Sequence, residues 1–286
     1  MKRKTWLWLI LLAAVLLGAE IIRSNYILKT EYLRFTSDAL TQPLRVVHLS
    51  DLHNAVFGKE NSDLLAAVAE QEPDLIFFTG DLVTGRAKKT DEAMNLVEAL
   101  VDIAPVYISI GNHEQRHENR FGSDLTGMLE YRGAKVMEFE YEDVPIGGDT
   151  VRIGGLSGYC VPEKYLWTGE AKEAECAFLK EMADTELTTL LLCHFPVSWI
   201  NNDAISYWDV EFVFSGHLHG GQWKLPLTGP VIAPDMGWFP ERTDGVFDSG
   251  DGQKHLIVSR GLGNSLPLFR LNNPPQLLVV DIVPEV

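Results

Sequence analysis

In the first half of the chain, three strongly apolar segments alternate with two segments of helical periodicity. Residues 44–50, 74–79 and 105–110 are short and rich in β-branched and aromatic side chains, as strands buried on both faces are. Residues 61–70 and 90–100 carry apolar side chains at helical spacing. A strand–helix–strand order requires right-handed crossovers and builds a parallel sheet covered by helices. The sequence therefore predicts an α/β fold.

The pattern continues less regularly towards the C-terminus. Further helices are predicted at 123–132 and 171–182, and further strands at 134–139, 151–156, 188–193, 212–215, 255–258 and 277–282. Residues 143–149 are expected to form a turn. Glycine and proline dominate residues 216–245, which predicts a long functional loop region. With 286 residues, 46% of them hydrophobic, the chain can form one large domain with a sizeable core.

Residues that bind metals or transfer protons follow five of the predicted strands directly. They are Asp51 and His53, Asp81, Asn112 and His113, His194, and finally His217 and His219. In open α/β sheets, ligands bind outside the carboxyl ends of the strands. We therefore expect these eight side chains to gather at one edge of the sheet.

The pairs Asp51/His53 and His217/His219 have the same spacing of two residues. In an extended segment such residues point to the same side, so each pair can face one pocket. Two converging imidazoles indicate a metal site, although loop histidines without a ligand are the alternative. Of the other histidines, His48 is expected in the core and His117 in solvent.

The eight residues are too many for one zinc ion, which takes three or four ligands. They suit two cations that share a carboxylate. Carboxylate, amide and imidazole ligands without a thiolate favour Mn, Fe or Zn. Two such ions can hold the attacking and leaving oxygens of a displacement at phosphorus.

The order Asp-x-His, Gly-Asp, Gly-Asn-His-Glu, His, Gly-His-x-His resembles the calcineurin-like metallophosphoesterase superfamily. The segments 50–54, 220–222 and 259–263 further resemble its membrane-associated bacterial phosphodiesterase branch. The resemblance covers about residues 44–285. It implies a four-layer αββα sandwich of two mixed sheets flanked by helices.

The resemblance also implies the role of each site residue. Metal one would bind Asp51, His53, Asp81 and His219, and metal two would bind Asp81, Asn112, His194 and His217. Asp81 would bridge the two ions. A metal-activated hydroxide would attack phosphorus, and His113 would stabilise the transition state and protonate the leaving oxygen.

Five further residues have predicted roles with open alternatives. Arg260 and Arg270 are candidates to hold the substrate, or are ordinary surface arginines. Glu114 is expected to orient His113 or a ligand, or to be a solvated loop carboxylate. Trp223 and Trp238 are interpreted as an apolar wall for a lipid or sugar, or as plain packing or anchoring at a membrane interface.

The N-terminus is basic at residues 2–4 and then uncharged from Trp6 to Ala19. This pattern predicts an uncleaved single-pass membrane anchor rather than a removed signal peptide or a buried helix. The basic start places the rest of the chain on the extracytoplasmic face. The expected organisation is an anchor at 1–25, a tether at 26–43 and a catalytic domain at 44–286. Within the tether, residues 26–35 mix charged and apolar side chains and are a candidate edge strand.

The function predicted from these features is hydrolysis of a membrane or cell-envelope phosphodiester. A phosphomonoesterase or protein phosphatase is the alternative, and a non-catalytic membrane-tethered scaffold is a third reading. The net charge of −16 disfavours nucleic acid as a partner. The three cysteines, Cys160, Cys176 and Cys193, are interpreted as buried thiols, with a Cys160–Cys176 bridge as the alternative.

Overall fold

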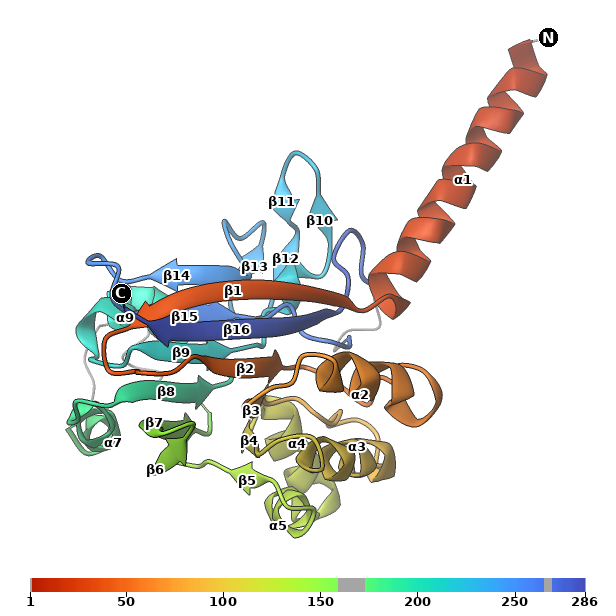
Figure 1. The fold of residues 1–286 in the computed structure, drawn as a ribbon. Helices are drawn as coiled ribbons and strands as arrows, with labels where there is room; N and C mark the ends of the chain where they lie inside the picture. Colours follow the sequence, from red (N-terminus) through yellow and green to blue (C-terminus); the bar gives the residue numbers. More distant parts are fainter. Residues whose placement is uncertain (1, 159–172, 265–268, 286) are drawn as a thin grey trace.

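Two six-stranded mixed sheets form the centre of the molecule (Figure 1). The computed structural model describes residues 2–158, 173–264 and 269–285. The first sheet has the order β1 (Lys29–Ser37), β16 (Gln276–Pro284), β2 (Leu44–Leu49), β3 (Leu75–Thr79), β4 (Val106–Ser109), β5 (Lys135–Val136). In this sheet β16 runs antiparallel to β2, and the other neighbouring pairs are parallel.

The second sheet has the order β14 (Gly245–Asp248), β15 (His255–Val258), β9 (Phe212–Ser215), β8 (Thr188–Cys193), β7 (Asp149–Leu156), β6 (Glu140–Ile146). Its four central strands are parallel, and the two edge strands are antiparallel to their neighbours. The turn expected at 143–149 is wrong in its first half, since β6 pairs with β7 through residue 146. The alternation of half-buried and exposed residues along β6 is that of an edge strand.

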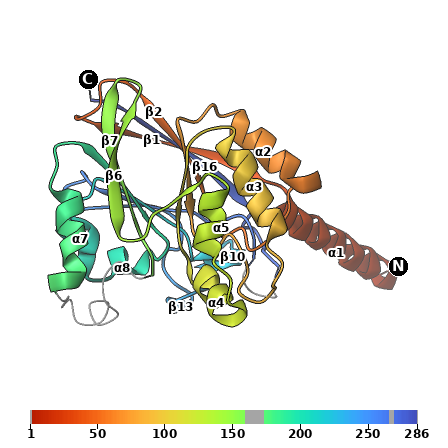
Figure 2. The same cartoon turned by 90° about the horizontal axis from the view of Figure 1, so that it is seen from below.

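Helices cover the outer face of each sheet (Figure 2). On the first sheet lie α2 (Ser62–Ala69), α3 (Asp91–Val101) and α5 (Leu125–Tyr131), and on the second lie α7 (Glu173–Ala183), α8 (Val197–Ile200) and α9 (Ala204–Tyr207). The short turns η1 (Lys59–Asn61) and η2 (Asn201–Asp203) lead into α2 and α9. These layers confirm the predicted αββα sandwich.

Three apolar clusters hold the layers together. One packs α2, α3 and α5 on the first sheet, and a second packs α7 to α9 on the other sheet. The third lies between the sheets, where Phe77 of β3 meets Phe214 of β9 edge to face at 5.0 Å. His48 also lies in this layer, as predicted, and its Nε2 contacts Thr79 Oγ1 at 2.8 Å. Burial lowers the pKa of His48 to about 3, so the ring is uncharged there.

The segment predicted to be a tether is largely a strand. Residues 29–37 pair in parallel with β16 over their full length, which agrees with the edge strand considered for residues 26–35. Their half-buried residues alternate with exposed ones, which is typical of an edge strand. Before it, α1 (Lys2–Tyr26) projects from the domain as one long helix (Figure 1). Among the described residues, one helix is both long enough and apolar enough to cross a membrane, and that helix is α1.

Two small hairpins follow β9 in the glycine-rich region. They are formed by β10 (Lys224–Leu225) with β11 (Gly229–Pro230), and by β12 (Ile232–Ala233) with β13 (Gly237–Trp238). Of the three cysteines predicted to be buried thiols, Cys193 is buried at the end of β8. Cys160 and the side chain of Cys176 lie outside the described part of the chain.

Candidate metal centre

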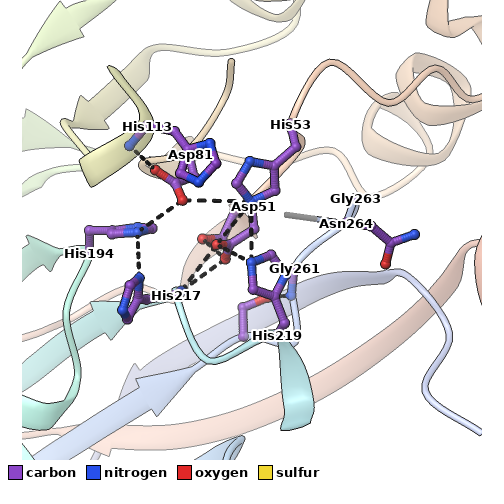
Figure 3. Close-up of polar contacts among 12 residues, drawn as sticks. Asp51, His53, Asp81, His113, His194, His217, His219, Gly261, Gly263 and Asn264 are labelled. Carbon is purple, nitrogen blue, oxygen red and sulfur yellow. Dashed lines mark hydrogen bonds and ion pairs between the residues drawn. The ribbon is translucent and has the colours of Figure 1, made fainter. Parts of the chain in front are cut away.

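The carboxyl ends of β2, β3, β8 and β9 meet at one edge of the two sheets, as the sequence predicts. Figure 3 shows the side chains that follow these strands pointing toward one another. The seven predicted metal residues come together here, and all but the half-buried Asn112 are buried. Two groups of three candidate ligands can be distinguished among them, and a third group consists of His53, Asp81 and His113.

The first group is Asp51, His53 and His219. The two imidazoles approach with their Nε2 atoms 3.2 Å apart, and His219 Nε2 lies 3.5 Å from Asp51 Oδ1. Burial lowers the pKa of His53 to about 3 and, with Arg270 nearby, that of His219 well below its usual value. Both rings are therefore neutral, and a neutral ring nitrogen is the form that binds a metal.

The second group is Asp81, His194 and His217. His194 Nε2 lies 3.4 Å from Asp81 Oδ2 and 3.2 Å from His217 Nδ1. Burial alone would lower the pKa of His194, but the carboxylate of Asp81 outweighs it and raises the pKa to about 10. A positive charge is thus favoured at this position, which a proton or a divalent cation can supply.

One carboxylate oxygen of Asp81 lies next to both groups of candidate ligands. Asp81 Oδ2 lies 3.6 Å from His53 Nε2 of the first group and 3.4 Å from His194 Nε2 of the second. A carboxylate placed between two sets of imidazoles is the arrangement that two divalent cations share.

A further observation indicates that these ligand atoms suit divalent cations. Asn112 Oδ1 and His53 Nδ1 are buried, and neither has a hydrogen-bond partner among the described residues. Asn112 lines the same cavity of about 230 Å³ as Asp81 and His217. A buried amide oxygen without a donor is costly unless something else pairs with it. Asn112, His194 and His217 would hold one ion, Asp51, His53 and His219 the other, and Asp81 both.

His113 lies beside both groups without belonging to the predicted ligands. It begins α4 (Asn112–Phe121), and its backbone N–H donates to Asp81 Oδ1 at 2.8 Å. Its Nδ1 accepts from the Gly85 N–H at 3.2 Å, so the proton of the neutral ring sits on Nε2. Burial lowers the pKa of His113, which favours this neutral form. Its Nε2–H can therefore donate to a substrate in the cavity.

Glu114 is buried rather than solvated, which decides between its two interpretations. Its carboxylate accepts the backbone N–H groups of Asp81, Val83 and Gly111 at 2.7–2.9 Å. Burial and the nearby charge of Asp81 raise its pKa to about 7. Glu114 thus ties the loop after β3 to the loop after β4.

The side chains converge for a different reason from the one predicted. Asp51, His53, Asp81, His217 and His219 have φ values between 49° and 69°, in the left-handed region, so the pairs do not lie on extended backbone. His219 begins the short turn η3 (His219–Gly221). Such backbone is strained in non-glycine residues and collects at functional sites. The tight turns, not strand alternation, direct both members of each pair inward.

The segment 259–263 forms a cradle for Asp51. Gly261 has φ 72°, and a Cβ there would lie 2.6 Å from Asp51 Cβ. The Gly263 N–H donates to Asp51 O at 2.6 Å, and Ser50 Oγ donates to Asp51 Oδ2 at 2.6 Å. Glycine at 261 is therefore required by both its backbone angle and its close contact.

The two predicted substrate arginines have other partners. Arg270 is fully buried; its guanidinium donates to the carbonyls of Gly263 and Arg260 and lies 3.4 Å from His219 Nδ1. Arg260 pairs with Glu31 at 2.9 Å. Neither arginine lines the cavity of about 230 Å³, and the contacts of Arg270 are with the segment that surrounds Asp51.

Sequence reasoning missed Arg86 and Arg116, two exposed arginines that line the cavity. Arg116 Nη1 lies 3.3 Å from His113 Nε2. It is one turn after His113 on α4, and the spacing of three residues on a helix was the signal available. His117 was predicted to be solvated but is buried, and its Nδ1 contacts Ser123 Oγ at 2.7 Å.

Comparisons with known proteins agree with this geometry. A family model described as calcineurin-like phosphoesterase matches residues 44–221. The chain is 30% identical over 277 residues to an uncharacterised metallophosphoesterase of Aquifex aeolicus, covering 94% of this chain and 97% of the relative. It is 26% identical over 244 residues to phosphodiesterase YaeI of Escherichia coli, covering 84% and 83%. A solved phosphopantetheinyl hydrolase from Mycobacterium tuberculosis matches 79% of this chain and 92% of that one, at 16% identity and a TM-score of 0.48.

Proposed function

Because the chain belongs to the calcineurin-like phosphoesterases, and is thus a metal-dependent phosphoester hydrolase, we propose that it hydrolyses phosphodiesters at a membrane. The observation that carries the proposal is the single oxygen of Asp81 that faces both histidine groups. The name of the phosphodiesterase relative favours a diester over a monoester substrate.

Bound divalent cations supply Lewis acidity and lower the pKa of a bound water toward neutrality. The residues of the chain position the substrate. Arg86 and Arg116 lie at the mouth of the cavity, where their charges attract an anionic phosphoester and offset the acidic net charge of the protein. We assign them the substrate-binding role first expected of Arg260 and Arg270.

His113 acts on the leaving group. Its Nε2–H donates to the oxygen that departs from phosphorus as negative charge develops there. Arg116 Nη1 and the Nε2–H are both donors, so they do not hydrogen-bond to each other; burial first, and then the charge of Arg116, lower the pKa of His113 and keep the ring neutral. Glu114 holds the backbone of Asp81 so that this geometry is present before substrate arrives.

The experiment compares bis(4-nitrophenyl) phosphate with 4-nitrophenyl phosphate, using full-length protein loaded with Mn or Zn. We expect kcat/KM to be higher for the diester. A preference for the monoester would replace the proposal with a phosphomonoesterase. Absence of turnover on both in a metal-loaded protein would favour the scaffold reading.

We also propose that α1 spans the membrane and that residues 27–286 form the catalytic domain on the extracytoplasmic face. The length and apolar surface of α1 and the basic residues before it support this orientation. Protease added to the outside of intact spheroplasts should digest the domain. Protection of the domain would reverse the orientation.

A further inference from the structure

Five exposed large apolar side chains and the half-buried Trp223 lie on the two hairpins after β9 and on the segment at residue 269. We call them the apolar rim: Trp223, Leu225, Leu227, Trp238, Phe239 and Phe269. Leu227, at the tip of the β10–β11 hairpin, is 99% exposed, and Trp238 is 69% exposed. Apolar side chains gathered in this way on a surface mark a contact with another apolar phase.

Hydrogen bonds connect the apolar rim to the C-terminal end of α1. The Asn25 side chain, in the last turn of α1, exchanges hydrogen bonds with the backbone of Arg270 at 2.8 and 3.0 Å. The Trp223 indole donates to Phe269 O at 2.7 Å, and the Lys224 N–H donates to Leu271 O at 2.9 Å. The β10–β11 hairpin therefore begins beside the point where α1 leaves the domain.

The second hairpin continues the same surface toward the metal centre. The Val231 N–H donates to Trp223 O, and the Phe239 N–H donates to Val231 O at 2.8 Å. Between β12 and β13, Pro234 lines the metal cavity and Asp235 Oδ2 lies 3.0 Å from His217 Nε2. One hairpin thus carries exposed aromatic residues on one side and part of the cavity wall on the other.

The direction of α1 indicates what covers the rim. In Figure 1 the β10–β11 hairpin projects from the same side of the molecule as α1. The apolar residues of α1 from Trp6 to Leu17 are exposed by half or more, so this helix needs an apolar environment. Tryptophan and phenylalanine beside such a helix match the aromatic residues found at the boundary of a bilayer.

We propose that the apolar rim inserts into the surface of the bilayer that α1 crosses, so that the metal cavity opens at the level of the lipid headgroups. A phosphoester carried by a lipid then reaches the cavity without leaving the membrane. The insertion stands on the rim and α1 alone, whereas the lipid-linked substrate rests on the proposed phosphodiesterase function.

The insertion is tested with a bimane label at Leu227→Cys in the full-length chain, reconstituted into phosphatidylcholine vesicles containing lipids spin-labelled near the headgroup. We expect strong quenching of the label by these lipids. The matched control is Tyr131→Cys, because Tyr131 is 88% exposed and ends α5, a helix that Figure 1 shows on the opposite side of the molecule from α1; this label should not be quenched. The unsubstituted chain gives the background from the natural cysteines.

Equal quenching at both positions, or none at Leu227→Cys, would overturn the insertion. Shielding of Leu227→Cys without lipid quenching, together with a cross-linked dimer, would assign the rim to a second copy of the chain instead.

The substrate class is tested by kinetics. For Leu227→Asp we expect the ratio of the rate on a vesicle-borne lipid phosphodiester to the rate on soluble bis(4-nitrophenyl) phosphate to fall by about tenfold, since one large side chain no longer enters the lipid. Tyr131→Ser should leave the ratio unchanged. An unchanged ratio in Leu227→Asp would refute the lipid substrate, whereas lack of turnover on both substrates in the unsubstituted protein would refute the proposed function and leave the quenching result intact.

Discussion

Both ends of the sheet pair hold carboxylates, but they differ in burial and in the groups that face them. At the carboxyl end of β2, β3, β8 and β9, Asp51 and Asp81 are buried and face imidazole nitrogens. The opposite end has a cavity of about 400 Å³ with its own acidic residues, Asp38, Glu186 and Glu211 among them.

Two of the carboxylates at the opposite end have ordinary side-chain partners. Glu211 accepts from Ser37 Oγ at 3.2 Å, while Asp209, largely exposed, pairs with Lys254 at 3.2 Å. His255, which borders this cavity, pairs with Asp248. The larger cavity is therefore the poorer candidate for catalysis. Acidic residues become a metal centre when water is excluded and several imidazoles converge on them.

The largest difference in activity should appear when one carboxylate charge is removed at the metal centre and, in a separate variant, at the opposite end of the sheets. We expect Asp81→Asn to lower activity by more than 100-fold, beyond the 10–100-fold typical of residues outside the ligand set, because both groups lose their common oxygen. Metal content measured by elemental analysis should fall with it. Asp38→Asn at the opposite end is the control and should retain both; full metal occupancy in Asp81→Asn would contradict the bridging role.

Replacing one histidine at each end separates catalysis from metal binding. His113→Ala should lower kcat by about 10²–10⁴-fold, because the leaving oxygen loses its donor. Metal content should stay at the level of the unsubstituted protein, since His113 is not a proposed ligand. His255→Ala is the matched control with unchanged kcat. Loss of both ions in His113→Ala would mean that its role is structural.

A substitution at Glu114 tests whether its hydrogen bonds to the backbone of the loops after β3 and β4 are needed for metal binding. Glu114→Ala leaves three backbone N–H groups without their acceptor, so we expect about 10–100-fold weaker metal binding and a free energy of unfolding lower by about 1–3 kcal/mol. Chelator competition and urea unfolding measure the two effects. Glu118→Ala, one turn later on α4, should keep the metal affinity; equal loss in both variants would argue against a specific role.

Removing metal ions should destabilise the whole domain. The ligands are close together only in the folded protein, so metal ions bind the folded state and not the unfolded chain. At a free metal concentration 100 times Kd, one site contributes about 2.7 kcal/mol to the free energy of unfolding. Thermal unfolding with and without a chelator should show this difference. In Asp81→Asn the chelator should have little effect, and an unchanged response there would place the stabilising ion elsewhere.

The smallest effect is expected at the opposite end, from Glu211. Burial raises its pKa to about 7 from an ordinary 4.5, so the folded protein disfavours its ionised form. This contribution lowers the free energy of unfolding as pH rises from about 4.5 through 7, and it is constant above. Glu211→Gln should therefore exceed the unsubstituted protein in Tm by about 2–4 °C at pH 8, with the difference vanishing near pH 4.5. Scans at both pH values check it, and a larger advantage at low pH would reverse the sign.

The central strands and the gathering of the candidate site residues at the strand ends could be predicted from the sequence, because both leave local signals. A buried parallel strand such as 75–79 is a continuous apolar run, and the site residues follow such runs directly. Helix α3 was predictable because its buried residues repeat at helical spacing. Edge strands leave weaker signals, since a half-exposed strand mixes charged and apolar residues: β1 was considered as one possibility for residues 26–35, and β6 was missed.

Contacts between distant segments decided the rest. The sequence by itself determined an α/β fold with a set of ligand-type residues at its strand ends. Only the tertiary structure buried Arg270 behind His219, brought Arg86 and Arg116 to the cavity, and set the rim beside α1. Local spacing determines which way a side chain can point. Burial, pKa and the choice of partner depend on groups that are far apart in the chain and meet only when the two sheets pack together.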